Sequence, residues 1–140
     1  MEVEVVKKRF TVDDYHRMAD AGILGPEDRV ELIDGEIVQM APIGYRHMAC
    51  VNRANELLIL ALANKAIVSP QNAVRLTQWT EPQPDIVVFK QTPDFYETRM
   101  PAAADALLVI EVSDVVQTDE NLPGTRLALR HGYIGLLWTA

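Results

Sequence analysis

Two acidic residues of this chain border or interrupt apolar, strand-like runs. Asp85 follows Pro84 and precedes the apolar run at residues 86–89, and Glu111 lies within the aliphatic run at residues 107–112. Because an unpaired carboxylate loses several kcal/mol or more on leaving water, each acid needs a cation, a polar partner or a strand end open to solvent. Carboxylate oxygens are the ligands that hard divalent cations prefer. The pair therefore predicts a metal site.

Plainer explanations exist for these acids. An acid that follows proline at the start of a strand is often solvated, which would account for Asp85 without a metal. Glu111 would be satisfied equally well by an arginine, for which Arg75 and Arg99 are candidates. A third acid, Glu31, lies in a predicted hairpin strand, where it faces either a cleft or water.

Length and composition indicate one globular domain. The 140 residues are 49% hydrophobic and 24% charged, enough apolar material for a core. A net charge of -7, with only 13 lysines and arginines, argues against a broad electrostatic grip on nucleic acid. The chain starts without a secretory pattern, and its longest aliphatic run, residues 57–63, is too short to cross a bilayer. We therefore expect a cytoplasmic protein with no membrane partner.

Three other side chains have both a structural and a chemical interpretation. The single cysteine, Cys50, excludes an internal disulfide, and its helix-like surroundings predict a buried thiol rather than a nucleophile. His47 lies on the apolar stripe of a predicted helix, either as a hydrogen-bonded core or cleft histidine or as a catalytic or phosphate-contacting one. Trp79 would either stack on a base or anchor a loop against the sheet.

Local signals define the first elements. Thr11 followed by Asp14 is typical of a helix N-cap, and Gly22 is suited to the end of that helix. The dipeptide Asp34-Gly35 favours a type I′ turn, which predicts a hairpin with strands at residues 29–33 and 36–40.

Further along, helical spacing predicts a long helix over residues 46–64. Apolar runs predict strands at residues 66–68, 73–76, 86–89 and 106–112. The tail is helix-like at residues 125–130 and strand-like at residues 134–138. Because few helices separate the later strands, the order favours an α+β fold over a doubly wound parallel sheet.

In this order, several segments make the chain resemble the Uma-two restriction endonuclease family, a bacterial branch of the PD-(D/E)xK nuclease superfamily. The segments that carry the resemblance are residues 11–15, 31–38, 40–44, His47, 81–85 and 109–114. The resemblance implies a restriction-endonuclease-like mixed sheet flanked by helices, as a single nuclease-like domain over residues 1–140. It also implies that Glu31, Asp85 and Glu111 gather as catalytic residues and ligands of Mg²⁺ or Mn²⁺, and that DNA phosphodiester bonds are hydrolysed.

The chain departs from this family pattern at its lysine. Ser113 stands where the superfamily has lysine, and residues 91–140 contain none. Alignment with the family puts Gly124 at the alternative lysine position; the nearest cation, Arg126, cannot transfer a proton. The chain also stops at Ala140, which predicts an incomplete C-terminal portion. We therefore expect a weakened or inactive endonuclease.

Two other classes of function stay open. The first is a non-catalytic homodimeric or partner-binding module on a nuclease scaffold, and a homodimer is expected in either case. The second is a cupin-like barrel suggested by the many short strands, against which the lack of a clustered His/Glu ligand motif speaks.

Overall fold

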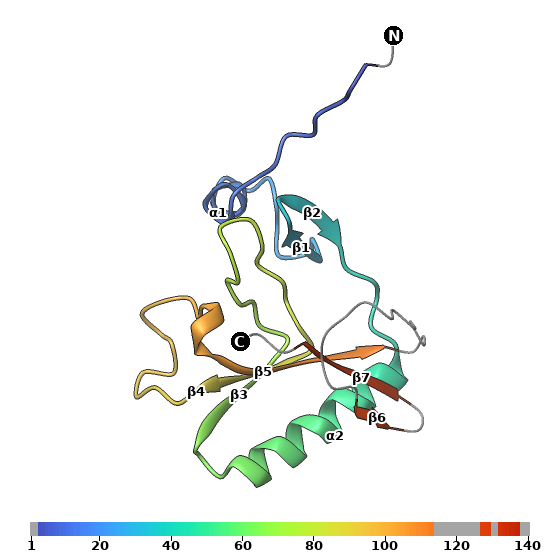
Figure 1. The fold of residues 1–140 in the computed structure, drawn as a ribbon, viewed down its shortest axis with the longest axis vertical. Coiled ribbons are helices and arrows are strands. Elements are labelled where there is room, and N and C mark those ends of the chain that lie inside the picture. Colours follow the sequence, from blue (N-terminus) through green and yellow to red (C-terminus); the bar gives the residue numbers. More distant parts are fainter. Residues whose placement is uncertain (1–2, 114–126, 130–131, 138–140) are drawn as a thin grey trace. The chain divides into compact units, whose positions relative to one another are not determined.

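The computed structural model describes residues 3–113, 127–129 and 132–137 (Figure 1). These residues fall into two compact units, which we describe one by one. Unit 1 comprises the chain up to Ala41 together with Arg75–Pro82, and unit 2 comprises Pro42–Val74 and the chain from Gln83 onward. The prediction of a single domain over residues 1–140 stays a prediction.

Unit 1 begins with the helix that its capping residues predict. Helix α1 spans Val12–Asp20, and the Thr11 hydroxyl accepts a hydrogen bond from the Asp14 amide at 3.1 Å. The Asp14 carboxylate accepts one in return from the Thr11 amide at 3.0 Å, and this backbone hydrogen bond is the main reason why the pKa of Asp14 is lowered. Beyond the helix, Gly22 adopts φ = 74°, as expected of a terminating glycine.

The predicted hairpin is confirmed. Strand β1 (Val30–Ile33) pairs antiparallel with β2 (Glu36–Gln39). At the turn both Asp34 (φ 49°) and Gly35 (φ 79°) have positive φ, as a type I′ turn requires. Gly35 also contacts other backbone, because its amide donates to the Trp79 carbonyl and its carbonyl accepts from the Phe10 amide.

The prediction of a strand at residues 73–76 is wrong. Residues 75–81 instead form a loop with isolated pairings, Thr77 with Thr80 and Leu32 with Glu81. Its side chains pack within unit 1, where the guanidinium of Arg9 lies 4.5 Å from the centroid of the Trp79 ring. Trp79 thus lies in a loop of unit 1 with a cation on the face of its ring, and its role as an anchor of that loop against a sheet stays a prediction.

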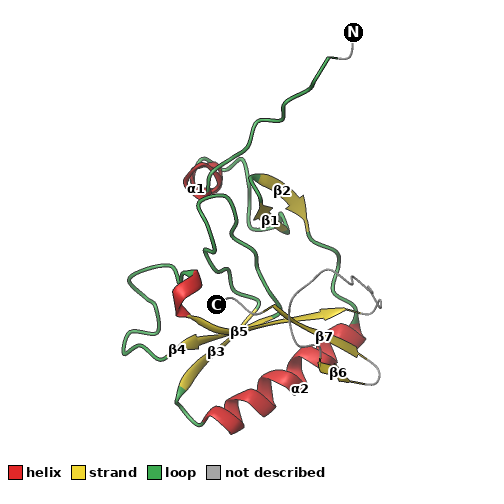
Figure 2. Ribbon diagram, in the orientation of Figure 1, coloured by secondary structure: helices red, strands yellow, loops and turns green. Residues whose placement is uncertain are grey.

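Unit 2 is built on a five-stranded sheet (Figure 2). Every described pairing in it is antiparallel, and the order β3-β4-β5-β7-β6 is open rather than closed into a barrel. The strands are β3 (Ala66–Pro70), β4 (Ile86–Lys90), β5 (Ala106–Ser113), β6 (Leu127–Leu129) and β7 (Gly132–Leu137). Residues 127–129 therefore form a strand where a helix was expected, because they pair with β7.

Helix α2 covers one face of this sheet (Figure 2). It spans Tyr45–Leu62, close to the predicted range, and ends at Ala63 in the left-handed conformation. Its Val51 joins Ile86, Ile110 and Val112 in a buried cluster, and Cys50 packs partly buried against it. Helices and an antiparallel sheet in this arrangement confirm the α+β class. Neither α1 nor α2 has the combination of length and apolarity that a membrane span requires.

A polar loop joins β4 to β5. Arg99 forms two hydrogen bonds with the Asp105 carboxylate, at 2.6 and 2.9 Å, and Asp105 also accepts one from the Ala102 amide. These contacts, the Arg99 side chain first, lower the pKa of Asp105 to about 2. The centroid of the Tyr96 ring lies 5.4 Å from that of the Phe89 ring, whereas the neighbouring Phe95 is exposed.

The hairpin turn gives a first test. A Cβ at position 35 would lie 2.7 Å from the Cβ of Arg9, whereas at position 22 it would have no atom within 4 Å. Both glycines have positive φ, so Gly22→Ala has only the conformational cost of about 1 kcal/mol. We expect Gly35→Ala to cost at least about 1 kcal/mol more, measured by urea unfolding. Equal costs for the two variants would contradict the close packing on Arg9.

The Asp105 ion pair gives a second test. Because the pKa in the folded protein is about 2 and the ordinary value is 3.8, the pair contributes stability above about pH 3.8. This contribution is lost as the pH falls through 2. We expect Arg99→Ala to raise the pKa of Asp105 toward 3.8, measured by ¹³C NMR titration of carboxyl carbons, while Arg53→Ala on the exposed side of α2 leaves it unchanged. An unchanged pKa in Arg99→Ala would refute the assignment.

Candidate metal centre around Asp85

Asp85 stands at the start of β4, held in place by its own backbone and that of its neighbours. Pro84 is fully buried; its ring fixes its own φ angle and disfavours a helical conformation at Gln83, the residue before it. The Asp85 carbonyl accepts a hydrogen bond from the Gln71 amide at 2.9 Å, and the Gln83 side chain donates to the Gln71 carbonyl at 2.6 Å. The position of Asp85 is therefore set by the segments that flank β3 and β4.

The Asp85 carboxylate connects two elements of unit 2. Oδ1 lies 2.7 Å from Nε2 of His47 on α2, and Oδ2 accepts a hydrogen bond from the Val112 amide on β5 at 2.7 Å. The Asp85 side chain is 12% exposed and that of His47 is 17% exposed. Hydrogen bonds to an ionised group in such a shielded place are among the stronger ones in proteins. The carboxylate is therefore held at both oxygens.

Glu111 lies on β5, the strand that pairs with β4. The last pair between the two strands joins Ile86 to Ile110; Asp85 comes directly before Ile86, and Glu111 comes directly after Ile110. Ile110 and Val112 face the α2 side of the sheet, which by strand alternation places Glu111 on the other face. Two of the three predicted site residues thus belong to one unit, and their sharing of a metal site stays a prediction.

Glu31 belongs to unit 1. It lies half-buried on β1 near Tyr15, and after desolvation, the largest cause, the charges of Glu81 and Glu31 raise the pKa of the Tyr15 phenol. The structure does not bring Glu31 together with Asp85 and Glu111 inside one unit. Its role in a shared site stays a prediction.

Unit 1 contains a second carboxylate–histidine pair that was not predicted. Nε2 of His16 lies 2.7 Å from Oε1 of Glu81, whose side chain is only 3% exposed, and Oε2 of Glu81 has no hydrogen-bond partner. Glu81 and Asp85 are the two ends of one five-residue segment, and each pairs with a histidine far away in sequence. The signal in the sequence was an acid on either side of Pro-Gln-Pro, but it gives no partner.

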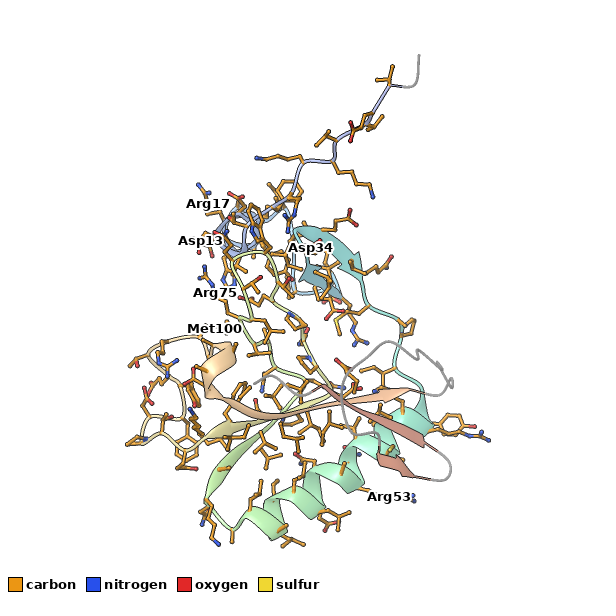
Figure 3. The ribbon with its side chains drawn as sticks, in the orientation of Figure 1. Asp13, Arg17, Asp34, Arg53, Arg75 and Met100 are labelled. Atoms are coloured by element: carbon orange, nitrogen blue, oxygen red, sulfur yellow. The ribbon has the colours of Figure 1, made fainter. Side chains whose placement is uncertain are left out.

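The two arginines expected as alternative partners of Glu111 each pair with a different acid. Arg75 pairs with Asp13, beside which it lies in Figure 3, and Arg99 pairs with Asp105, so each arginine has an acid other than Glu111. The alternative lysine position, Gly124, and the nearest cation, Arg126, lie outside the described residues.

The donor chemistry at Asp85 fits a divalent cation held by few protein ligands. Among the described residues, no three His, Cys, Asp or Glu side chains are assembled to hold a metal ion. Mg²⁺, however, is usually bound by one or two carboxylates and several waters. Each oxygen of Asp85 accepts one hydrogen bond and keeps a lone pair, and Glu111 is the second carboxylate. That Asp85 and Glu111 would together hold such an ion stays a prediction.

The model of the Uma2 family, described as "Putative restriction endonuclease", matches residues 12–122. Among solved structures, the chain is similar to a "putative nuclease belonging to DUF820" from Anabaena variabilis ATCC 29413, with 19% identity and a TM-score of 0.49. That similarity covers 58% of this chain and 43% of the other, so the chain spans less than half of that protein. No curated protein matches the chain.

The family match covers the capped helix, the hairpin, α2 and both carboxylate-bearing strands. It confirms the family resemblance and, with the α+β architecture, the predicted fold class. Because residues 12–122 make up most of its length, the chain belongs to the Uma2 family of restriction endonuclease-like proteins.

Proposed function

We propose that this chain binds a divalent cation, Mg²⁺ or Mn²⁺, through Asp85 and Glu111 and hydrolyses phosphodiester bonds of DNA with it. The observation that carries the proposal is a shielded carboxylate, fixed at both oxygens by N–H donors, directly before a strand whose partner strand contains a second carboxylate. A nuclease family supplies the reaction class. Glu31 is proposed as a third, assisting acid.

The chain's own residues would bind the cation and fix the orientation of the carboxylate that holds it. Asp85 and Glu111 place negative charge where a cation can be held, and the His47 and Val112 donors limit rotation of Asp85. When bound, such an ion supplies positive charge to the attacked phosphate and lowers the pKa of a coordinated water. With serine instead of lysine at position 113, the side chain that usually orients that water is missing there, so hydrolysis should be slow.

The surface charges of unit 1 support a substrate that is recruited through the ion rather than through a basic patch. Four of its cations are paired with acids, which leaves little net positive potential for phosphates. The pairs are Lys7–Glu36, Arg9–Asp34, Arg17–Asp14 and Arg75–Asp13. Contact with DNA should therefore depend on the divalent ion. We also propose that the protein is a homodimer located in the cytoplasm.

One observation favours the second candidate, a non-catalytic binding module. The Asp85 carboxylate already accepts a hydrogen bond at each oxygen, so the fold satisfies it without a cation. A fold that satisfies this carboxylate without a metal ion would stay folded even if catalysis were lost.

Metal binding is the first test, because every catalytic version of the proposal depends on it. In Asp85→Asn the amide oxygen still accepts from Val112, and the amide nitrogen can donate to Nε2 of His47 when the neutral imidazole carries its proton on Nδ1, so the variant removes the charge and keeps the hydrogen bonds. We expect calorimetry to show Mn²⁺ binding to the wild type and at least about tenfold weaker binding to Asp85→Asn. The control Asp13→Asn, exposed in unit 1, removes one charge and should bind like the wild type. Without Mn²⁺ binding by the wild type, the metal proposal fails.

Nicking of supercoiled plasmid DNA separates the two candidate functions. We expect slow nicking by the wild type with Mn²⁺, and none by Asp85→Asn or Glu111→Gln, because each variant removes one carboxylate of the proposed site. Gel electrophoresis over several hours measures the nicked fraction, with Asp13→Asn as the active control. Metal binding without nicking would support the binding module instead.

A further inference from the structure

His47 is the one side-chain donor that the described residues place on the Asp85 carboxylate. It lies in the first turn of α2, and its Nε2 is 2.7 Å from Oδ1 of Asp85. An ionised carboxylate only accepts hydrogen bonds, so Nε2 carries the proton in this pair. The other oxygen is held by a backbone amide, that of Val112, which no substitution can remove without changing the backbone.

The two donors act on different oxygens and arrive from different elements. A single hydrogen bond leaves the carboxylate plane free to turn, because the torsion of an aspartate carboxylate has a broad minimum. Donors at both oxygens, one on α2 and one on β5, restrict that torsion. The lone pairs of the Asp85 oxygens that are not bonded to His47 or Val112 then point in a fixed direction.

A purely structural role, joining α2 to the sheet, would be largely redundant. Val51 already packs the helix on Ile86, Ile110 and Val112, with Ala54 and Leu58 contributing from the next turns. Burial of this apolar surface holds the helix on the sheet without a polar contact.

We propose that His47 is the positioning residue of the Asp85 site, holding the carboxylate in the orientation that receives a divalent cation. This inference rests on the proposed metal-binding function of Asp85. Hydrogen-bond partners of metal ligands typically contribute 10- to 100-fold to metal affinity. The donor N–H of His47, rather than its ring volume, is what the site requires.

A matched pair of substitutions isolates that N–H. Glutamine and methionine have the same length, and the glutamine amide nitrogen takes roughly the position of Nε2, while methionine offers no donor. We expect His47→Met to weaken Mn²⁺ binding by about 10- to 100-fold and His47→Gln to recover most of the loss. His47→Ala, which needs no added volume in the half-buried site, should behave like His47→Met. Calorimetry gives the dissociation constants, and thermal unfolding without metal shows that each variant is folded.

The second carboxylate–histidine pair supplies the control. His16→Met removes a histidine at the same 2.7 Å distance from a shielded acid, Glu81, but in unit 1. We expect it to leave Mn²⁺ affinity unchanged.

Each outcome bears on a different proposal. If the wild type binds Mn²⁺ and Asp85→Asn does not, while His47→Met and His47→Ala bind like the wild type, the positioning role is overturned and the metal site stands. A lower unfolding temperature with unchanged affinity would likewise leave His47 a structural residue only. If the wild type does not bind Mn²⁺, the metal site and the positioning role both fail.

Discussion

The hydrogen bond from the Val112 amide to the Asp85 carboxylate is the interaction on which the site depends. Strand β5 extends past Ile110, its last residue that pairs with β4. In that extension the Val112 amide donates a hydrogen bond to the Asp85 side chain at 2.7 Å. Because a buried amide without a partner costs about 1–3 kcal/mol, the acid at position 85 completes the sheet as well as lining the candidate site.

Parts of this architecture follow from short-range signals. The capping pair Thr11 and Asp14 and the dipeptide Asp34-Gly35 specify backbone geometry within a few residues, which is why the first helix and the hairpin were predicted with nearly their observed bounds. The placement of Asp85 and Glu111 on neighbouring strands was also predictable, since each acid adjoins or interrupts an apolar run. In all these cases the determining residues lie close together in the chain.

Other features depend on contacts that a single sequence does not contain. His47 and His16 meet acids 38 and 65 residues away, and only the packed chain shows which acid each one finds. Residues 127–129 have helix-forming side chains but form a strand, because pairing with β7 outweighs a weak local preference. Val74 is fully buried although it lies in a loop, and the apolar residues around it were therefore mistaken for a strand.

Asp85 both accepts the hydrogen bond of the Val112 amide and lines the candidate site, and this combination has an evolutionary consequence. A substitution of Asp85 by a residue without a side-chain acceptor would be selected against in any descendant that merely needs to fold, because the Val112 amide would lose its acceptor. An aspartate at this position in a homologue is therefore no evidence of catalytic competence. Catalytic competence therefore has to be judged from the other residues of the candidate site, among them Glu111 on the neighbouring strand β5.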